Sequence, residues 1–155
     1  MQSPHHDQRG LRGLPAGSPR VILVAEDDPE YRGVLNEILS HFGHTVLVAA
    51  NGAEAFDLLQ QHHVDLIVSD INMPQCSGTQ LHEMVREKEQ FRGIPFVFMT
   101  GLAILRAATP LHHGGMDYMV NKVPLDRVVG LIDEISLRQL DPTIGAVEAA
   151  SSSLT

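Results

Sequence analysis

The amino-acid sequence predicts an α/β protein with a doubly wound, five-stranded parallel sheet and five helices. Between residues 20 and 140, short apolar runs such as residues 21–24 alternate with stretches whose apolar residues recur at helical spacing. A parallel strand that is covered on both faces has a continuous apolar sequence, so this alternation is typical of a sheet between two layers of helices. Because crossover connections are right-handed, the helices are expected on both faces.

The first half of this region carries clear signals for where helices begin and end. After the first strand, Asp28 is a helix N-cap, and Pro29 is tolerated in the first turn, where its missing N–H has no partner in any case. Gly43 supplies the left-handed residue that ends this helix. Asn51 and Glu54 form a capping-box pattern that opens the second helix. The five strands are expected at residues 21–24, 45–49, 64–68, 94–99 and 117–121.

The second half is less regular. A loop with Pro74 and Gly78 precedes a polar third helix that ends near Glu89. The apolar residues 102–113 predict the fourth helix, which Pro110 makes short, broken or shifted. A last helix follows the fifth strand and carries apolar residues at helical spacing: Val128, Val129, Leu131, Ile132 and Ile135.

Composition excludes several classes of function. The chain has 155 residues and a formal net charge of −8, which argues against a nucleic-acid-binding surface and against a polybasic membrane anchor. Its apolar runs are too short to cross a bilayer. The only cysteine, Cys76, can form no intrachain disulfide, so a reducing compartment, the cytoplasm, is expected. The nine histidines lack the spacing of zinc ligands and are expected at the surface or at helix ends.

The domain is expected to span residues 20–140. Residues 1–19 and 141–155 are rich in glycine, proline and serine and show no hydrophobic period, so a disordered leader and a disordered tail are expected there. Too few residues follow Leu140 for an effector module, which predicts a protein that acts without one.

Five polar side chains follow four of the predicted strands. Glu26 and Asp27 follow the first strand, Asp70 ends the third, Thr100 ends the fourth and Lys122 follows the fifth. Because open parallel sheets form their sites at the carboxyl ends of the strands, these side chains are expected to converge. Any one of them alone is more simply interpreted as a turn or cap residue, but their joint placement predicts a site.

The residue types indicate phosphoryl chemistry. Three neighbouring carboxylates repel one another unless a cation relieves them, and Mg²⁺ is a hard cation that binds oxygen ligands and accepts phosphate as a further ligand. A lysine and a threonine hydroxyl can hold phosphoryl oxygens. An aspartate can act as the nucleophile and form an acyl phosphate. Asp70 is the candidate for that role.

Taken together, these motifs resemble the CheY-like receiver domain of bacterial response regulators. The resemblance covers residues 20–140, and it is carried by residues 21–28, by residues 70–74 with Gly78, by residues 98–101 and by Lys122. It implies a flavodoxin-like fold with strand order 2-1-3-4-5.

The resemblance also implies roles for the site residues. Asp70 would accept phosphate from the phosphohistidine of a histidine kinase or phosphotransfer protein. Asp27 and Asp70 would bind Mg²⁺ directly and Glu26 through water, with the backbone carbonyl of Asn72 as a further ligand. Thr100 and Lys122 would bind the phosphoryl group. Such a protein is not otherwise an enzyme, since it catalyses only its own phosphoryl transfer and loss.

Output is expected to pass to a protein partner, to a second copy in a homodimer, or onward as phosphate. The family's usual output face comprises the fourth helix, the fifth strand and the fifth helix. The apolar residues 102–111 would contribute to a docking surface there. Simple core burial of these residues is the equally weighted alternative.

The sequence departs from the family pattern near the lysine. Val123 follows Lys122, where the family commonly has proline, and Pro124 comes one place later; the Lys122–Val123 bond is therefore expected to be trans. Met119 occupies the position of the family's switch aromatic residue, with Tyr118 beside it. These departures favour one alternative function, a phosphate-independent interaction module with the receiver fold. A phosphotransferase or phosphatase acting on small molecules is disfavoured, because Asn72 stands where such families tend to have a second acid.

Overall fold

A computed structural model describes residues 19–101, 109–111 and 116–140. The chain divides into two compact units, of which Pro19–Ile132 contains the whole sheet. The described part of the other unit is residues 133–140, where Arg138 pairs with Glu134 one helical turn away at 2.8 Å. The predicted leader up to residue 18 and the predicted tail after residue 140 lie outside the described residues.

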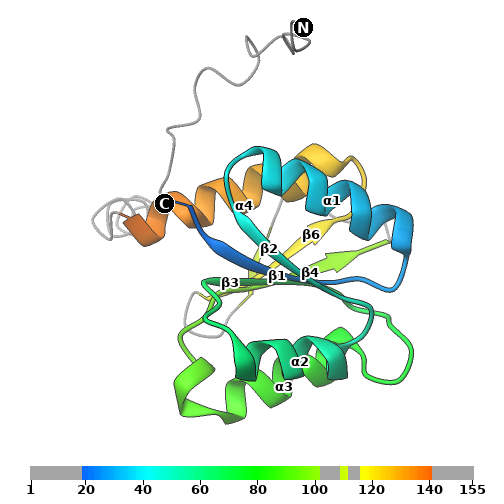
Figure 1. Ribbon diagram of the computed structural model, residues 1–155, viewed down its shortest axis with the longest axis vertical. Helices are drawn as coiled ribbons and strands as arrows, with labels where there is room; N and C mark the ends of the chain where they lie inside the picture. Colours follow the sequence, from blue (N-terminus) through cyan, green and yellow to red (C-terminus); the bar gives the residue numbers. More distant parts are fainter. Residues whose placement is uncertain (1–18, 102–108, 112–115, 141–155) are drawn as a thin grey trace, which may run out of the picture. The chain divides into compact units, whose positions relative to one another are not determined.

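The sheet has the predicted parallel order (Figure 1). Within the described residues, five parallel strands lie in the order β2-β1-β3-β4-β6, and a sixth, antiparallel strand, β5, lies beside β6. The fifth strand expected from the sequence is therefore β6. The strands are β1 (Val21–Ala25), β2 (Thr45–Ala49), β3 (Leu66–Asp70), β4 (Phe96–Thr100), β5 (Thr109–Leu111) and β6 (Asp117–Asn121).

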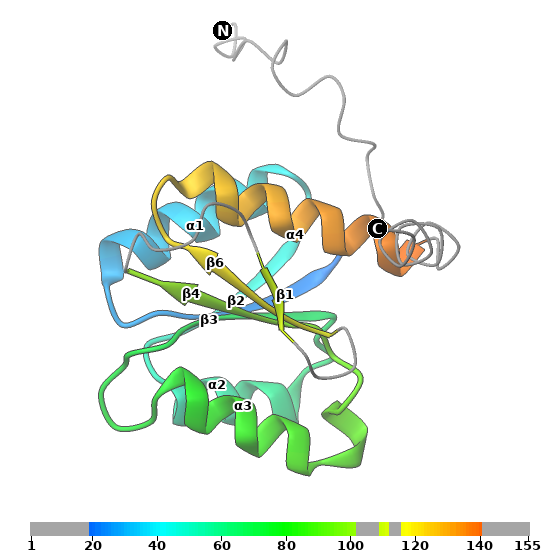
Figure 2. The same cartoon turned by 180° about the vertical axis from the view of Figure 1, so that it is seen from behind.

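Helices cover both faces of the sheet. Figures 1 and 2 show α1 and the first part of α4 on one face and α2 and α3 on the other. A short 3₁₀ turn follows α3. The described helices are α1 (Pro29–His41), α2 (Gly52–Gln61), α3 (Gly78–Glu87), the 3₁₀ helix η2 (Glu89–Phe91) and α4 (Leu125–Leu140). The described residues thus contain four α-helices, one fewer than expected.

Capping residues define where the helices next to the strand ends begin and end. The side chain of Asp28 accepts a hydrogen bond from the amide of Glu30, and that of Asn51 accepts one from the amide of Glu54. Gly43 has φ +92°, the left-handed conformation predicted for the end of the first helix. At α3, Ser77 and Gln80 form a reciprocal capping box. The caps at Asp28, Asn51 and Ser77 satisfy amides that the first turn of a helix leaves unpaired.

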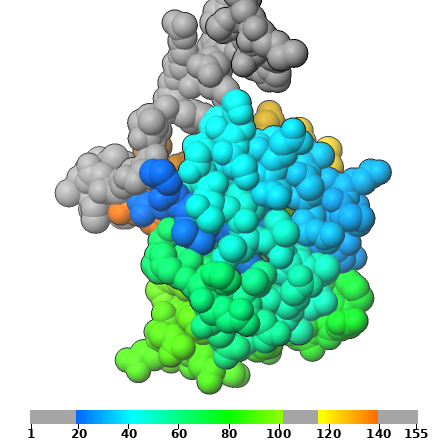
Figure 3. Space-filling view, viewed as in Figure 1, coloured from blue at the N-terminus to red at the C-terminus, as the bar shows by residue number. Residues whose placement is uncertain are grey.

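The apolar runs form the core, as predicted. Leu23, Ile67 and Phe96 have no exposed surface and belong to one cluster on the face covered by α2 and α3. Figure 3 shows the side of the molecule at β2, where residues of α1, β2 and α2 form the surface. No helix among residues 19–101 and 116–140 combines the length and the apolar character that a membrane span requires.

The fourth helix expected over residues 102–113 is wrong at Thr109–Leu111. These residues form β5, which pairs antiparallel with β6 (Figure 2). Pro110 explains the difference, because proline has no N–H for a helix interior but is tolerated on the edge strand of a sheet. The rest of that stretch, residues 102–108 and 112–113, lies outside the described residues.

A buried ion cluster at the start of β6 was not expected from the sequence. The carboxylate of Asp117 is 1% exposed; it pairs with the guanidinium of Arg86 and lies 2.9 Å from Nε2 of His82. His82 and Arg86 are four residues apart on α3, so they lie on the same side of that helix. His82 also packs edge-on against Phe96. The expectation that the histidines lie at the surface or at helix ends is therefore wrong for His82.

Candidate functional site

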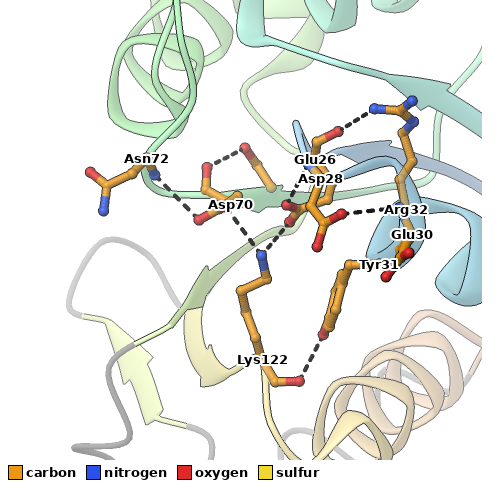
Figure 4. Close-up of polar contacts among 9 residues, drawn as sticks. Glu26, Asp28, Glu30, Tyr31, Arg32, Asp70, Asn72 and Lys122 are labelled. Atoms are coloured by element: carbon orange, nitrogen blue, oxygen red, sulfur yellow. Dashed lines mark hydrogen bonds and ion pairs between the residues drawn. The ribbon is translucent and has the colours of Figure 1, made fainter.

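Three carboxylates meet at the carboxyl ends of β1 and β3, as predicted. Glu26 and Asp27 directly follow β1, and Asp70 is the last residue of β3. Each offers an oxygen, and these oxygens all lie within 4.8 Å of one another. Figure 4 shows Glu26 and Asp70 facing each other across this gap. The neighbouring strands β1 and β3 therefore bring these groups from distant parts of the sequence to one place.

Lys122 enters the same space from the end of β6. Its Nζ lies 2.8 Å from Oε2 of Glu26 and 3.2 Å from Oδ2 of Asp70 (Figure 4). The amide of Lys122 also donates a hydrogen bond to the carbonyl of Thr100 at 2.9 Å, which aligns the end of β6 with the end of β4. The cis peptide bond near this residue is Val123–Pro124, so the Lys122–Val123 bond is trans, as predicted. The unusual residue after the lysine has not moved the lysine out of the site.

Glu26 is held in place from several sides. It has no exposed surface, its Oε1 accepts a hydrogen bond from the amide of Asp28 at 3.1 Å, and its carbonyl accepts one from Arg32 at 2.8 Å. Asp27, by contrast, is exposed. The carboxylate cluster thus has two buried members, Glu26 and Asp70, and one member that faces solvent, Asp27.

Burial and neighbouring charges both shift the pKa of Glu26, which is buried, and of Lys122, which is partly buried. Burial raises the pKa of Glu26; Lys122 and the amide of Asp28 oppose this shift, and the charge of Asp70 adds to it. Burial alone would lower the pKa of Lys122, but its contacts with Glu26 and Asp70 outweigh that effect, so the pKa of Lys122 is raised. The lysine therefore remains a cation in the site.

The loop after Asp70 stays close to its carboxylate. The amide of Asn72 donates a hydrogen bond to Oδ1 of Asp70 at 3.3 Å, while the Asn72 side chain is exposed and points away in Figure 4.

The amide of Gly78 donates to the carbonyl of Ile71 at 2.9 Å. A Cβ at Gly78 would lie 2.1 Å from the Asp70 carbonyl oxygen, so only glycine allows α3 to begin this close to the strand.

Thr100 lies where the sequence predicted it, at the end of β4. In the register of the sheet, Asp70 pairs with Met99 and Thr100 pairs with Asn121. Thr100 is buried and stands one residue beyond the partner of Asp70 on the neighbouring strand. Its hydroxyl therefore belongs to the same end of the sheet as the carboxylates.

Tyr118 and Thr100 lie on opposite faces of the sheet. Met119 packs against the cluster that contains Phe98, on the face covered by α2 and α3. Side chains alternate along a strand, so Thr100 shares the face of Phe98 and Tyr118 takes the face of α1 and α4. Tyr118 is 7% exposed. Of these two neighbouring β6 residues, Met119 and not Tyr118 therefore lies on the face of Thr100.

Tyr31 is a contact of the site that the sequence analysis missed. From the first turn of α1, its hydroxyl donates a hydrogen bond to the carbonyl of Lys122 at 2.8 Å, and Nζ of Lys122 lies 4.5 Å from the centre of its ring. Burial raises the pKa of Tyr31, and the charges of Glu26 and Asp70 act in the same direction, so the hydroxyl stays protonated as a donor. The sequence signal was ambiguous because Tyr31 also fits the apolar period of the helix.

The donor set fits a hard divalent cation. All three groups of the cluster supply carboxylate oxygens, and no histidine or cysteine joins them among the described residues. Oxygen ligands are those that Mg²⁺ prefers, and one ammonium does not neutralise three carboxylates. The residues present are therefore compatible with the predicted magnesium site.

Comparison with known proteins places the chain in a family. Residues 22–133 match the response regulator receiver domain. The polar-differentiation response regulator DivK of Brucella anthropi is 26% identical over 104 residues, which cover 67% of this chain and 85% of DivK.

Solved structures agree. The receiver domain of a sensor histidine kinase from Pseudomonas aeruginosa PAO1, with a magnesium ion coordinated in its active site cleft, is 25% identical with a TM-score of 0.63, over 78% of this chain and 97% of that one. The response regulator TrrA of Thermotoga maritima, in complex with Mg²⁺–BeF, is also 25% identical, with a TM-score of 0.60 over 74% of this chain and 97% of TrrA. The strand order, the carboxylates at the strand ends and the match over residues 22–133 lead to one conclusion: the chain belongs to the response regulator receiver domain family.

Proposed function

We propose that this receiver domain accepts a phosphoryl group on Asp70 from a histidine kinase or a phosphotransfer protein and signals through protein partners. The observation that carries the proposal is the position of Nζ of Lys122 between Glu26 and Asp70, two carboxylates whose oxygens lie within 4.8 Å of an oxygen of Asp27. A nucleophilic carboxylate, a fixed cation and further carboxylates are the parts that phosphoryl transfer to an aspartate requires.

The chemistry assigns a task to each side chain. An oxygen of Asp70 forms the new bond to phosphorus while the phosphorus–nitrogen bond of the donor phosphohistidine breaks, and the imidazole keeps the electron pair. Lys122 holds a phosphoryl oxygen as a point charge, and the hydroxyl of Thr100 donates to another. The reaction needs positioning and charge neutralisation more than covalent help from the protein. The protein would catalyse only its own phosphorylation and dephosphorylation.

Asp27 and Asp70 would hold Mg²⁺ directly, Glu26 through water, and the carbonyl of Asn72 would complete the protein ligands. When bound, the ion supplies charge neutralisation at the carboxylates and at the phosphoryl oxygens. Two observations support this assignment: the oxygen-only donor set of the cluster, and the Mg²⁺ present in the similar domains from Pseudomonas aeruginosa and Thermotoga maritima.

The output is proposed to be a protein–protein contact in the cytoplasm, with a downstream partner or with a second copy of the chain. The formal net charge of −8 disfavours nucleic acid and anionic membrane surfaces as partners. Of the face formed in the family by the fourth helix, the fifth strand and the fifth helix, the proposal keeps β6 and the start of α4. It assigns no helix at Thr109–Leu111, which form β5.

Acetyl phosphate, a small phosphoryl donor, tests the proposal without knowledge of the kinase. Wild-type protein incubated with acetyl phosphate and Mg²⁺ should gain one phosphoryl group by intact mass, and omission of Mg²⁺ should abolish the gain. Asp70→Asn should gain none. Asp57→Asn, which changes an exposed carboxylate on α2, is the matched control and should behave as wild type. A wild-type protein that gains no mass under these conditions would favour the phosphate-independent interaction module.

A further inference from the structure

We propose that Tyr31 is a positioning residue that holds Lys122 in reach of Asp70. The inference rests on the proposed function, because it assigns to Tyr31 a part in the phosphorylation of Asp70. Tyr31 belongs to α1, whereas Lys122 follows β6, and the two are 91 residues apart in the sequence. Figure 4 shows the ring of Tyr31 alongside the lysine side chain, on the side away from Asp70.

Tyr31 contacts Lys122 at both of its ends. The hydroxyl donates to the lysine carbonyl at 2.8 Å, and the ring lies 4.5 Å from the ammonium. The first contact anchors the main chain at the point where β6 ends, and the second is a cation–π contact that favours the charged ammonium near the ring. The Tyr31 side chain therefore limits the position of both the main chain and the ammonium of Lys122.

The main chain at Lys122 is held by the hydrogen bond from its own amide to the carbonyl of Thr100, and Tyr31 adds a second contact there and a contact with the ammonium. The next residue, Val123, is 72% exposed and does not pack the start of the following loop against the protein. A lysine side chain has four flexible methylene groups, so its ammonium can occupy many positions unless something limits them. Glu26 and Asp70 attract the ammonium through contacts at Nζ, whereas Tyr31 also holds the main chain of the lysine.

Tyr31 lies in a helical turn whose conformation is fixed by capping. It is the third residue of α1, and the preceding turn is fixed by Pro29 at the helix start and by the Asp28 side chain, which accepts from the amide of Glu30 at 3.0 Å. The same turn begins directly after Glu26 and Asp27. Helix α1 thus carries the support for the lysine on the same segment that carries two of the carboxylates.

A purely structural role, in which the ring only fills space, is the competing explanation. The two explanations differ in whether the effect of changing Tyr31 depends on Lys122. If Tyr31 acts through the lysine, a substitution at Tyr31 should change the phosphorylation rate only while the lysine is present. If it acts through packing, the loss should be the same with or without the lysine.

The first arm of the experiment measures the rate of phosphorylation by acetyl phosphate at saturating Mg²⁺. Tyr31→Leu should slow the reaction by about tenfold, the loss expected when a hydrogen bond and a cation–π contact both disappear. Tyr31→Phe keeps the ring and should fall between Tyr31→Leu and wild type. Val34→Ala, an exposed change on the same helix, should leave the rate unchanged. Mg²⁺ affinity should not fall in either Tyr31 variant.

The double variants decide the mechanism. In a Lys122→Ala background, Tyr31→Leu should cause no further loss of rate. A further loss as large as that in the wild-type background would overturn the proposal, and so would a Tyr31→Leu protein that reacts as fast as wild type.

The second arm does not depend on phosphorylation. By nuclear magnetic resonance, the Cε protons of Lys122 should be shifted upfield by the ring current of Tyr31; Tyr31→Phe should keep this shift and Tyr31→Leu should remove it. If wild-type protein takes up no phosphate but shows this pattern, the proposed function fails while Tyr31 still positions the lysine. If wild-type protein is phosphorylated but the lysine protons show no dependence on the ring, the positioning role is wrong.

Discussion

The ammonium of Lys122 lies closer to Glu26 than to the aspartate that it is proposed to assist. The two distances are 2.8 Å to Oε2 of Glu26 and 3.2 Å to Oδ2 of Asp70. Glu26 is fully buried, and the proposed phosphorylation of Asp70 would make no covalent change to it. Under the proposed function, the pair with Glu26 would remain, and the bond to Asp70 would be the one exchanged for a phosphoryl oxygen.

Removal of the charge of Glu26 should weaken Mg²⁺ binding. Glu26→Gln preserves the shape of the side chain but removes the negative charge that would hold Mg²⁺ through water, and it leaves Lys122 to neutralise Asp70 alone. Both effects lower the affinity for Mg²⁺, by about 10- to 100-fold for a change at a group that supports a metal site. Calorimetric titration with MgCl₂ measures the change. Glu30→Gln, an exposed carboxylate four residues away, is the control; equal Mg²⁺ affinity in Glu26→Gln and wild type would contradict a role for Glu26 in the metal site.

A methyl group at Gly78 should disturb the phosphoacceptor strand. A Cβ there would lie 2.1 Å from the carbonyl oxygen of Asp70, so the start of α3 or the end of β3 must shift. We expect Gly78→Ala to lower the free energy of unfolding by about 1 to 3 kcal/mol, as overpacking does, and to slow phosphorylation.

The matched variant for this prediction is Gly33→Ala. Gly33 lies in α1 with nothing within 4 Å of the added Cβ, so alanine should raise the free energy of unfolding by about 0.5 to 1 kcal/mol through its better helix propensity. Urea denaturation monitored by circular dichroism compares the two. If both substitutions shift the midpoint in the same direction, the close approach at Gly78 does not determine stability.

The buried cluster around Asp117 should matter for stability and not for the site. Asp117→Ala leaves Arg86 and His82 without their anionic partner, and loss of one member of a buried pair costs about 3 kcal/mol. Glu134→Ala removes the exposed partner of Arg138 and should cost less than about 1 kcal/mol. Mg²⁺ affinity should be unchanged in both, because Asp117 begins β6 and Lys122 follows its other end. Urea midpoints and Mg²⁺ titrations of the three proteins check both statements; a weaker Mg²⁺ affinity in Asp117→Ala would show that the two ends of β6 are coupled.

Tyr31 should make the fold sensitive to alkali. Burial, helped by Glu26 and Asp70, raises the pKa of Tyr31 above the value near 10 that tyrosine has in an unfolded chain. Because the folded-state pKa is the higher one, the contribution of the neutral hydroxyl to stability is complete below about pH 10 and is lost as the pH rises from there toward the folded-state pKa.

Tyr31→Phe has no hydroxyl to ionise at this position and serves as the reference. Unfolding by urea at about pH 8 and about pH 11 should show that wild-type protein loses more stability than Tyr31→Phe over that range. Parallel losses in the two proteins would mean that ionisation of Tyr31 does not affect folding.

Much of the fold could be predicted because local signals and burial agreed. Continuous apolar runs predicted the positions of the parallel strands, the resemblance to receiver domains implied their order, and the caps at Asp28 and Asn51 predicted the starts of the first two helices. The site residues were predicted for a related reason: strand ends in a parallel sheet share one edge, so Glu26, Asp70 and Lys122 could be grouped without coordinates.

The remaining features depend on contacts that local patterns do not contain. Pro110 ruled out a regular helix, but only the pairing with Tyr118 shows that its segment is an edge strand. His82 and Tyr31 both match the apolar period of a helix, and each has a polar partner more than 30 residues away in the sequence. Helical spacing predicts which side of a helix faces the core, but it does not predict which polar group of another element that side contacts.

Strand β5 restricts the motion of the strand that precedes Lys122. Because β6 pairs with β4 along its whole length and with β5 over residues 117–119, the first part of the strand that leads to the lysine is interior to the sheet and is not an edge. Amides at Tyr118 and Met119 should accordingly exchange slowly with deuterated solvent, since opening requires the loss of bonds on two sides. Any adjustment of the lysine toward a phosphoryl oxygen would then come from rotation of its own side chain, while its main chain stays in register.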